Sequence, residues 1–366
     1  MPTPSSLQST ILDNFESNFS DDSVLPREVI RYTLIAKSVF VYGAPFILLL
    51  GIIGNTLTVV IFNRKSLRNT SYSWLFTCLA VSDSGYLCTG LVRRWVVFYR
   101  NYDFRMWHWF VCTLHYFLTY VFSQLSPWML ILITIERCVS VVAPMRAKII
   151  CSRKRMIYAS ILMTLIILLA NSHMLYGIRI VLPFGCEEKD DDYSDFWFDY
   201  WVHVELFLTT LGPFMILLLC NAVIIISIKR SQMRQAAMTN TATSSGSSGG
   251  GASTKTRKQN QTESITVMLV ATNFMFVFTS LPFSVYLLLP TFEHKLVDAC
   301  FSLLSYVNYA INFWLYCFTG RRFRTELYEL CRCRPKKTAT QQRRSLSSQS
   351  IATSVATSSS NSECRF

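Results

Sequence analysis

The feature that most constrains the fold of this chain is a series of seven apolar stretches, each long enough to cross a lipid bilayer. A membrane-spanning helix needs about 20 mostly apolar residues. Because lipid offers no hydrogen-bond partners to backbone N–H and C=O groups, each stretch must be helical. The sequence therefore predicts an all-α fold, a seven-transmembrane helix bundle, with spans near residues 36–62, 73–98, 109–141, 156–180, 202–228, 265–290 and 297–319.

Composition supports the membrane interpretation. Of the 366 residues, 51% are hydrophobic and only 16% are charged, which is more apolar surface than a water-soluble protein can bury. A net charge of +13 on a soluble domain would suggest nucleic acid, but here the charges lie between the apolar runs. We therefore expect the lipid bilayer as a partner and no nucleic acid.

The distribution of charge indicates the orientation. With the amino terminus outside, 25 of the 35 Lys and Arg residues face the cytosol and 16 of the 22 acids face the exterior. Basic residues are enriched on the cytosolic side of membrane proteins, so the opposite topology would invert this bias. Residues 1–35 are polar and lack a basic start followed by an apolar core, so no cleavable signal peptide is expected.

Modification signals lie in two segments, one on each side of the membrane. Residues 1–35 are expected to be an extracellular segment, glycosylated at Asn18 in the sequon Asn18-Phe19-Ser20. Residues 321–334 are expected to hold an amphipathic helix on the inner membrane surface, from Arg321 to Leu330, followed by Cys331 and Cys333 as candidates for palmitoylation. The alternative for these two cysteines is a pair of reduced cytosolic thiols.

Two cytosolic segments have the composition of flexible chain. Residues 229–264 hold a Gly/Ser/Thr-rich linker, and residues 335–366 form a Ser/Thr-rich tail that we expect to be disordered. Residues 36–320 would then be the membrane domain. Phosphorylation of the tail serines would convert it into a dense anion.

Most of the 12 cysteines lie in the spans or the cytosol, where disulfides are rare. Outside are Cys112 at the start of the third span, Cys186 in the following outer loop and Cys300 near the top of the seventh span. An oxidising exterior favours a Cys112–Cys186 disulfide.

Polar and proline residues inside the spans follow a particular order, although such polar groups are costly in lipid. These residues are Asn55, Asp83, Glu136-Arg137-Cys138, Pro213, Pro282 and Asn312-Phe313-Trp314-Leu315-Tyr316, with Arg137 at 25 residues after Cys112. Together their spacing resembles the rhodopsin-like (class A) G-protein-coupled receptors over about residues 36–333, and the endings of the third and seventh spans are most similar to invertebrate neuropeptide receptors.

The resemblance implies a plasma-membrane receptor that binds an extracellular ligand and activates a heterotrimeric G protein, with receptor kinases and arrestin acting on the tail. Glu136, Arg137, Asn312 and Tyr316 would take part in G-protein activation, with Glu136 holding Arg137 at rest. The alternative for Arg137 is a side chain that merely extends to the inner interface.

Asp83, Ser126, Asn308 and Asn312 match the sodium site of that family. A carboxylate in low dielectric needs a cation or a proton, so the alternative is a protonated Asp83 in a hydrogen-bonded network. No cofactor is otherwise required.

Several positions depart from the family pattern. Thr279-Ser280-Leu281-Pro282 replaces the usual Cys-Trp-x-Pro, Phe313 replaces a proline and Asn221 replaces a tyrosine. Pro127 replaces a branched apolar residue, and the fourth span lacks its usual tryptophan. These changes leave the fold intact and alter the positions that the family uses for activation.

The sequence excludes two classes of ligand, amines and a retinal chromophore. Amine receptors that this chain resembles carry an Asp where Thr119 stands, and light receptors carry a Lys in the seventh span, where residues 297–319 have none. Arg93 and Arg94 lie at the predicted mouth of the bundle and suit an anionic ligand group; alternatively they pair with loop acids. Residues predicted to contact ligand are Arg93, Arg94, Tyr116, Thr119, Tyr120, Gln124, Glu205, Phe283, Tyr286 and Tyr306.

The outer loop from Cys186 to Trp201 carries seven acids against Lys189. This field would concentrate cationic ligands, or would be a solvated loop that shields the arginines. The leading interpretation is a neuropeptide receptor. The alternatives are a receptor for a small carboxylate or lipid and, more remotely, a transporter or channel, although no internal repeat is evident. An enzyme is not expected, because neither a metal-spaced His/Cys cluster nor a nucleophile–base pair is evident.

Overall fold

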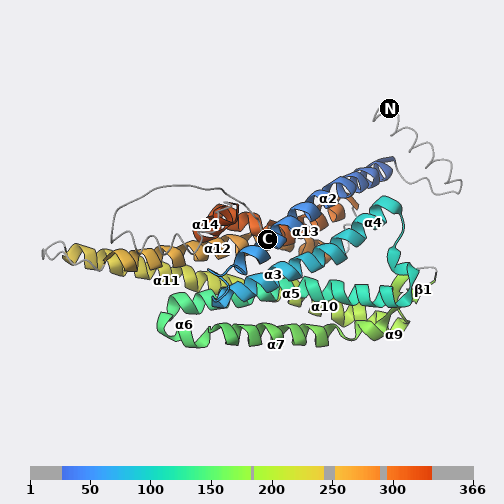
Figure 1. The fold of residues 1–366 in the computed structure, drawn as a ribbon. Helices are drawn as coiled ribbons and strands as arrows, with labels where there is room; N and C mark the ends of the chain where they lie inside the picture. Colours follow the sequence, from blue (N-terminus) through green and yellow to red (C-terminus); the bar gives the residue numbers. More distant parts are fainter. Residues whose placement is uncertain (1–26, 183–184, 243–251, 289–294, 332–366) are drawn as a thin grey trace, which may run out of the picture.

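The computed structural model describes residues 27–182, 185–242, 252–288 and 295–331. Within these ranges the chain forms long helices that run side by side (Figure 1). Asn18, Cys333 and residues 335–366 lie outside the described part. The long helices are α2 (Arg27–Phe62), α3 (Ser71–Tyr86), α5 (Trp109–Val142), α7 (Arg153–Asn171), α11 (Gly212–Ala242), α12 (Ala252–Leu288) and α13 (Lys295–Thr319).

Short elements extend or connect the long helices. The second span continues from α3 through a π-turn into α4, and the fifth is a succession of short α- and π-helical segments that leads into α11. The short elements are η1 (Leu87–Leu91), α4 (Val92–Arg100), η2 (Phe104–Trp107), α6 (Pro144–Ile150), α8 (Met174–Gly177), α9 (Asp191–Phe196), η3 (Trp197–Trp201), α10 (Val202–Leu206), η4 (Phe207–Leu211) and α14 (Arg321–Cys331).

Six of the helical segments in the described residues are long and apolar enough to cross a membrane, and α13 is not among them. With 25 residues, α13 is long enough, at about 1.5 Å per residue. Its buried face carries polar side chains, including Ser302, Asn308 and Asn312, which lower its average hydropathy. These side chains face the bundle rather than lipid, so their polarity does not prevent α13 from occupying the seventh position.

The helices extend beyond several of the predicted spans. α2 begins at Arg27 rather than near residue 36, and the fifth helical segment begins at Asp191 rather than near 202, inside the region expected to be an acidic loop. Helices also enter the expected linker 229–264, up to Ala242 and again from Ala252. Hydropathy finds only the part of a helix that lies in lipid, and polar turns at either end escape it.

A β-hairpin that was not predicted lies at the end of the bundle near α4 and α9 (Figure 1). Strand β1 (Ile178–Val181) pairs antiparallel with β2 (Gly185–Glu188), so the fourth helix ends at Gly177 rather than near 180. Cys186 on β2 is disulfide-bonded to Cys112 on α5, as predicted. We call this the hairpin end, and the opposite end, with α6 and α14, the α14 end.

An aromatic cluster fills the α14 end of the bundle and comprises Phe62, Tyr72, Phe76, Tyr316 and Phe323. The rings of Phe62 and Phe76 stack at 4.5 Å between centroids, and Tyr316 meets Phe76 edge-on at 5.2 Å. Phe323 of α14 is only 4% exposed, and the centroid of its ring lies 5.6 Å from that of Tyr316. The predicted helix α14 is therefore anchored by insertion of Phe323 into the bundle, rather than only by contact with lipid.

Gly177 provides a test of the packing at the hairpin end. A Cβ atom at this position would lie 1.9 Å from Cζ of Tyr193, so Gly177→Ala must displace that ring. We expect the substitution to destabilise the purified protein by about 1–3 kcal/mol, the usual cost of overpacking, measured as a lower thermal midpoint. Gly43→Ala is the matched control, since its Cβ would meet only the flexible end of Leu303 at 3.2 Å. Equal midpoints for both variants would contradict this account.

Candidate functional site

A cavity of about 580 Å³ opens at the hairpin end between the helices. Its wall combines tyrosine and tryptophan rings with a few charged side chains, the composition typical of a ligand pocket. The residues that line it include Tyr86, Arg93, Arg94, Arg105, His115, Tyr116, Thr119, Tyr120, Ser123, Trp197, Trp201, Glu205, Thr209, Ser280, Phe283, Ser284 and Tyr306.

Eight of the ten residues predicted to contact ligand lie in this wall, and two do not. Gln124 is fully buried behind the wall, where its amide donates to the Glu205 carboxylate. The ring of Tyr286 lies edge-on to Phe301, with 6.1 Å between centroids. Helical spacing thus identified the correct face of each helix but not the depth of every side chain. The lining residues it identified are Arg93, Arg94, Tyr116, Thr119, Tyr120, Glu205, Phe283 and Tyr306.

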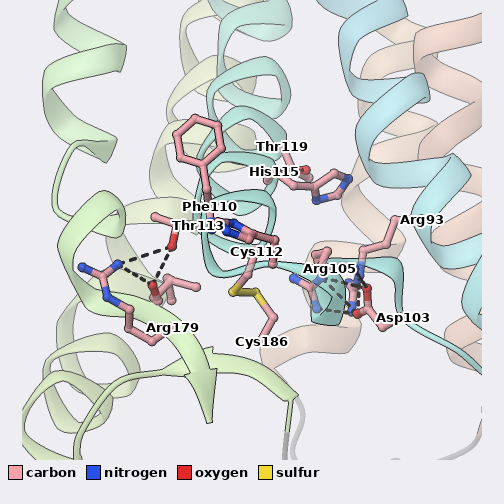
Figure 2. The surroundings of a disulfide bond; sticks show 12 residues. Arg93, Asp103, Arg105, Phe110, Cys112, Thr113, His115, Thr119, Arg179 and Cys186 are labelled. Atoms are coloured by element: carbon pink, nitrogen blue, oxygen red, sulfur yellow. Dashed lines mark hydrogen bonds and ion pairs between the residues drawn. A yellow bond between two sulfur atoms is a disulfide. The ribbon is translucent and has the colours of Figure 1, made fainter.

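The basic side of the cavity is organised by Asp103 (Figure 2). Its Oδ2 accepts hydrogen bonds from Nη2 of Arg93 and from Nη2 of Arg105, each at 2.8 Å. Burial would raise the pKa of the Asp103 carboxyl, but the hydrogen bonds from Arg105 and Arg93 outweigh it and hold this pKa below its usual range. One carboxylate therefore serves two guanidinium groups, and this trio carries a net positive charge.

Arg94 is also paired, but its partner is an acid at a helix start, whereas the alternative of pairing with loop acids holds for Arg93 and Asp103. Nη2 of Arg94 lies 2.8 Å from Oδ2 of Asp298 at the start of α13, and its guanidinium lies over the ring of Phe40. The partners are Asp103 and Asp298, so the arginines are not shielded by the acids of residues 186–201. In that segment Lys189 pairs with its neighbour Asp190 at 3.0 Å.

A buried polar centre lies in the middle of the bundle around Asp83, which is fully buried. Oδ1 of Asp83 accepts a hydrogen bond from the Ser126 hydroxyl at 2.5 Å, and Oδ2 accepts one from Nδ2 of Asn312 at 2.7 Å. Asn308 is buried one helical turn before Asn312. Three of the four residues predicted to form this centre are therefore in direct contact, and they join α3, α5 and α13.

At the α14 end, Arg137 and Glu136 form an ion pair, with 2.8 Å between Nε and Oε2. Ser71 donates a hydrogen bond of 2.7 Å to the other oxygen of Glu136. The guanidinium of Arg137 also lies over the ring of Tyr72, 4.2 Å from its centroid, a contact that the sequence did not suggest. Arg137 is 6% exposed, so it is enclosed rather than extended to an interface.

The positions that depart from the family pattern have defined surroundings. Ser280 lines the cavity, and Phe313 packs against Gly54, whose added Cβ would lie 2.8 Å from that of Phe313. Asn221 on α11 accepts a hydrogen bond of 2.9 Å from Nδ2 of Asn273 on α12. The Asn273 amide also donates to the hydroxyl of Thr134 on α5 at 3.3 Å, so a buried polar contact joins three helices.

Sequence reasoning missed the cavity residues Arg105, Trp197 and Trp201. Arg105 lies in a short turn without periodicity, and only its spacing of two residues from Asp103 hinted at a pair. The two tryptophans lie in the segment 191–201, which was expected to be a loop. Recognising that the helix continued there would have placed both rings over the cavity.

Asp103 allows a test of the basic side. Asp103→Asn removes the charge that Arg93 and Arg105 share and should lower the stability of the purified protein by about 2–3 kcal/mol. Since the folded pKa lies below the usual value, this stabilisation is complete above about pH 4 and is lost as pH falls further. The difference in thermal midpoint should therefore stay constant from pH 5 to pH 8.

The control for this experiment is Asp192→Asn, which removes an exposed acid of α9. A difference between wild type and Asp103→Asn that disappears between pH 8 and pH 5 would show that the Asp103 carboxylate is not held by the arginines.

Comparison with known proteins agrees with this arrangement. Residues 54–316 match the profile of the family described as 7 transmembrane receptor (rhodopsin family), which covers more than half of the chain. No curated protein matches the chain. The match and the helical architecture together confirm the predicted all-α seven-transmembrane bundle, in a family of signalling receptors that are generally not enzymes. The chain belongs to the rhodopsin family of seven-transmembrane, G-protein-coupled receptors.

Proposed function

We propose that this receptor binds an extracellular peptide, of the neuropeptide kind, and activates a heterotrimeric G protein at its α14 end. The observation that carries this proposal is that one helix, α5, connects the two sites. Near its start α5 contributes Tyr116 and Tyr120 to the cavity, and near its end it carries Arg137. Ser126, bound to Asp83, lies between them.

The orientation that suits this function places the hairpin end outside the plasma membrane. The disulfide at the hairpin end and the excess of basic residues in the segments at the α14 end support it. Glycosylation of Asn18, palmitoylation of Cys331 and Cys333, and action of receptor kinases and arrestin on residues 335–366 belong to the same proposal. Cys331 is exposed at the end of α14, where it is accessible for acylation.

A peptide is favoured over the alternative ligands by the mixed character of the wall. Arg93, Arg94 and Arg105 suit a carboxylate, whereas Glu205 suits a cation, and aromatic rings line the same cavity. A small carboxylate would use the arginines and leave Glu205 without a role. A lipid would use the aromatic rings and leave the charges of Glu205 and of the arginines with smaller roles.

The proposal is tested by exposing membranes that contain the receptor and a G protein to a library of short peptides. We expect at least one peptide to stimulate nucleotide exchange. Arg137→Ala should abolish the stimulation while cell-surface expression is retained, because it removes the group that engages the G protein. Stimulation that survives Arg137→Ala would refute the role of Arg137.

The alternative of a receptor for a small carboxylate or lipid is tested with a panel of small carboxylates and fatty acids. If these stimulate exchange and no peptide does, the receptor takes a small carboxylate or lipid instead. Ligand-evoked current in membranes free of G protein would favour the transporter or channel.

We also propose that Tyr72 holds Arg137 at rest. The ring faces the guanidinium, and its hydroxyl accepts a hydrogen bond of 3.3 Å from Arg322 of α14. Tyr72→Leu removes the cation–π contact and should raise ligand-independent nucleotide exchange about 2–10-fold. Tyr72→Phe keeps the ring and should stay close to wild type. Unchanged basal exchange in Tyr72→Leu would show that the contact does not restrain Arg137.

The centre at Asp83 is proposed to bind sodium. The residues fit the ion chemically, because the Asp83 carboxylate, the Ser126 hydroxyl and the side-chain carbonyl of Asn308 carry oxygen atoms that can bind it. Asn312 presents its Nδ2 to Asp83, so its carbonyl oxygen would join these ligands once the amide turns. The purified receptor should melt at a higher temperature in sodium chloride than in N-methylglucamine chloride at the same concentration. Asp83→Asn should abolish this difference. An equal sodium effect in the variant would place the ion elsewhere.

A further inference from the structure

Glu205 on α10 is held from behind by a chain of buried amides. Gln124 donates from Nε2 to the Glu205 carboxylate, and Asn171 of α7 donates from Nδ2 to Oε1 of Gln124 at 2.7 Å. Asn171 also donates to the carbonyl oxygen of Ile167 at 2.8 Å. Gln124 and Asn171 are both fully buried. The amides thus fix the carboxylate of Glu205 while this residue lines the cavity.

Within the described residues, this carboxylate has no cationic partner. The arginines of the cavity are paired elsewhere, Arg93 and Arg105 with Asp103 and Arg94 with Asp298. Glu205 is also the one acid among the described lining residues. An acid placed in low dielectric beside neutral amides gains strongly from a cation brought by a ligand.

Aromatic rings line the same cavity as this carboxylate. Tyr120 lies one helical turn from Gln124, and Trp201 lies one turn from Glu205, so their side chains share faces with these residues. The Tyr120 ring lies 5.5 Å from that of Trp197 and 5.1 Å from that of Tyr116. The faces of such rings attract cations, and Arg105 already lies over Tyr116 in this way at 5.6 Å.

The backbone around Glu205 is irregular in a way that serves the same site. Two π-turns, η3 and η4, flank the five residues of α10. A π-turn inserts a residue into a helix, redirects the side chains that follow and often marks a functional site. The Trp197 and Trp201 rings and Glu205 therefore reach the cavity from a segment whose register is shifted relative to both ends of the helix.

We propose that Glu205, with Tyr120, Trp197 and Trp201, forms a subsite for a guanidinium group of the ligand, such as an arginine side chain. A guanidinium suits the subsite better than an ammonium, because it can bind a carboxylate with two hydrogen bonds and stack on a ring. Arg93 and Arg105 are paired with Asp103, and Arg94 with Asp298, so the anionic part of the ligand would take a separate position beside them. This inference rests on the proposed function in taking the guanidinium to belong to a peptide.

The test measures direct binding of small probes to the purified receptor in nanodiscs by saturation-transfer NMR. N-acetyl-argininamide is compared with N-acetyl-citrullinamide, which has the same shape but no charge. We expect the arginine probe to bind wild type about 10–100-fold more tightly, as for hydrogen bonds between charged groups. Glu205→Gln should remove this preference, since the amide keeps the shape and an acceptor for Gln124.

The matched control is Glu187→Gln, which neutralises an exposed acid of β2 and should leave the preference unchanged. Equal binding of the two probes to wild type would overturn the inference, and this comparison does not depend on any variant folding. A preference that survives in Glu205→Gln would overturn it as well, as would no binding of the arginine probe at millimolar concentration.

The outcome is separate from that of the peptide screen. If the arginine probe binds through Glu205 but no peptide stimulates nucleotide exchange, the subsite stands and the proposed function fails. If peptides stimulate exchange and the probe binds equally to wild type and Glu205→Gln, the function stands and the subsite fails.

Discussion

The contact on which the rest of the bundle depends is the one between Asp83, Ser126 and Asn312. A carboxylate buried in a membrane protein is costly unless its oxygens are satisfied, and here the donors come from two other helices. The requirement fixes α3, α5 and α13 relative to one another. The backbone of α13 is tied to α2 in the same layer, where Nδ2 of Asn55 donates to the carbonyl of Tyr309 at 3.1 Å. The cavity lies on one side of this layer, and Arg137 lies on the other.

Several residues that the family usually carries between these two sides are replaced here, and the replacing residues make contacts of their own. Where the family carries an aromatic switch, Ser280 leaves space in the cavity. Where it carries a tyrosine, Asn221 joins Asn273, which also contacts Thr134. This buried contact holds α5, α11 and α12 together, and separating them would leave amides without partners in a low-dielectric interior. Phe313 fills space beside Gly54 where a proline would have bent the helix.

Much of the bundle could be predicted from the sequence because lipid imposes a strong and simple pattern. The order of polar residues along the spans also allowed two pairs to be predicted, Asp83 with Asn312 and Glu136 with Arg137. Both pairs lie within or between regular helices, where side-chain positions follow from the spacing. Asp103 and Arg105 could not be assigned, because contacts in a turn depend on neighbours that periodicity does not specify. The helical segment that begins at Asp191 was also missed, because its acidic residues lower the average hydropathy. For the same reason Trp197 and Trp201 were not assigned to the cavity.

The central claim is that a ligand in the cavity and a G protein at Arg137 act on one equilibrium. Linkage then requires each to strengthen the binding of the other. The direct measurement is the affinity of a peptide agonist for the receptor in nanodiscs, with and without nucleotide-free G protein. We expect the G protein to raise this affinity, typically by about 5–150-fold, and a guanine nucleotide to reverse the effect. An affinity that is the same in both conditions would contradict the coupling, however tightly the peptide binds.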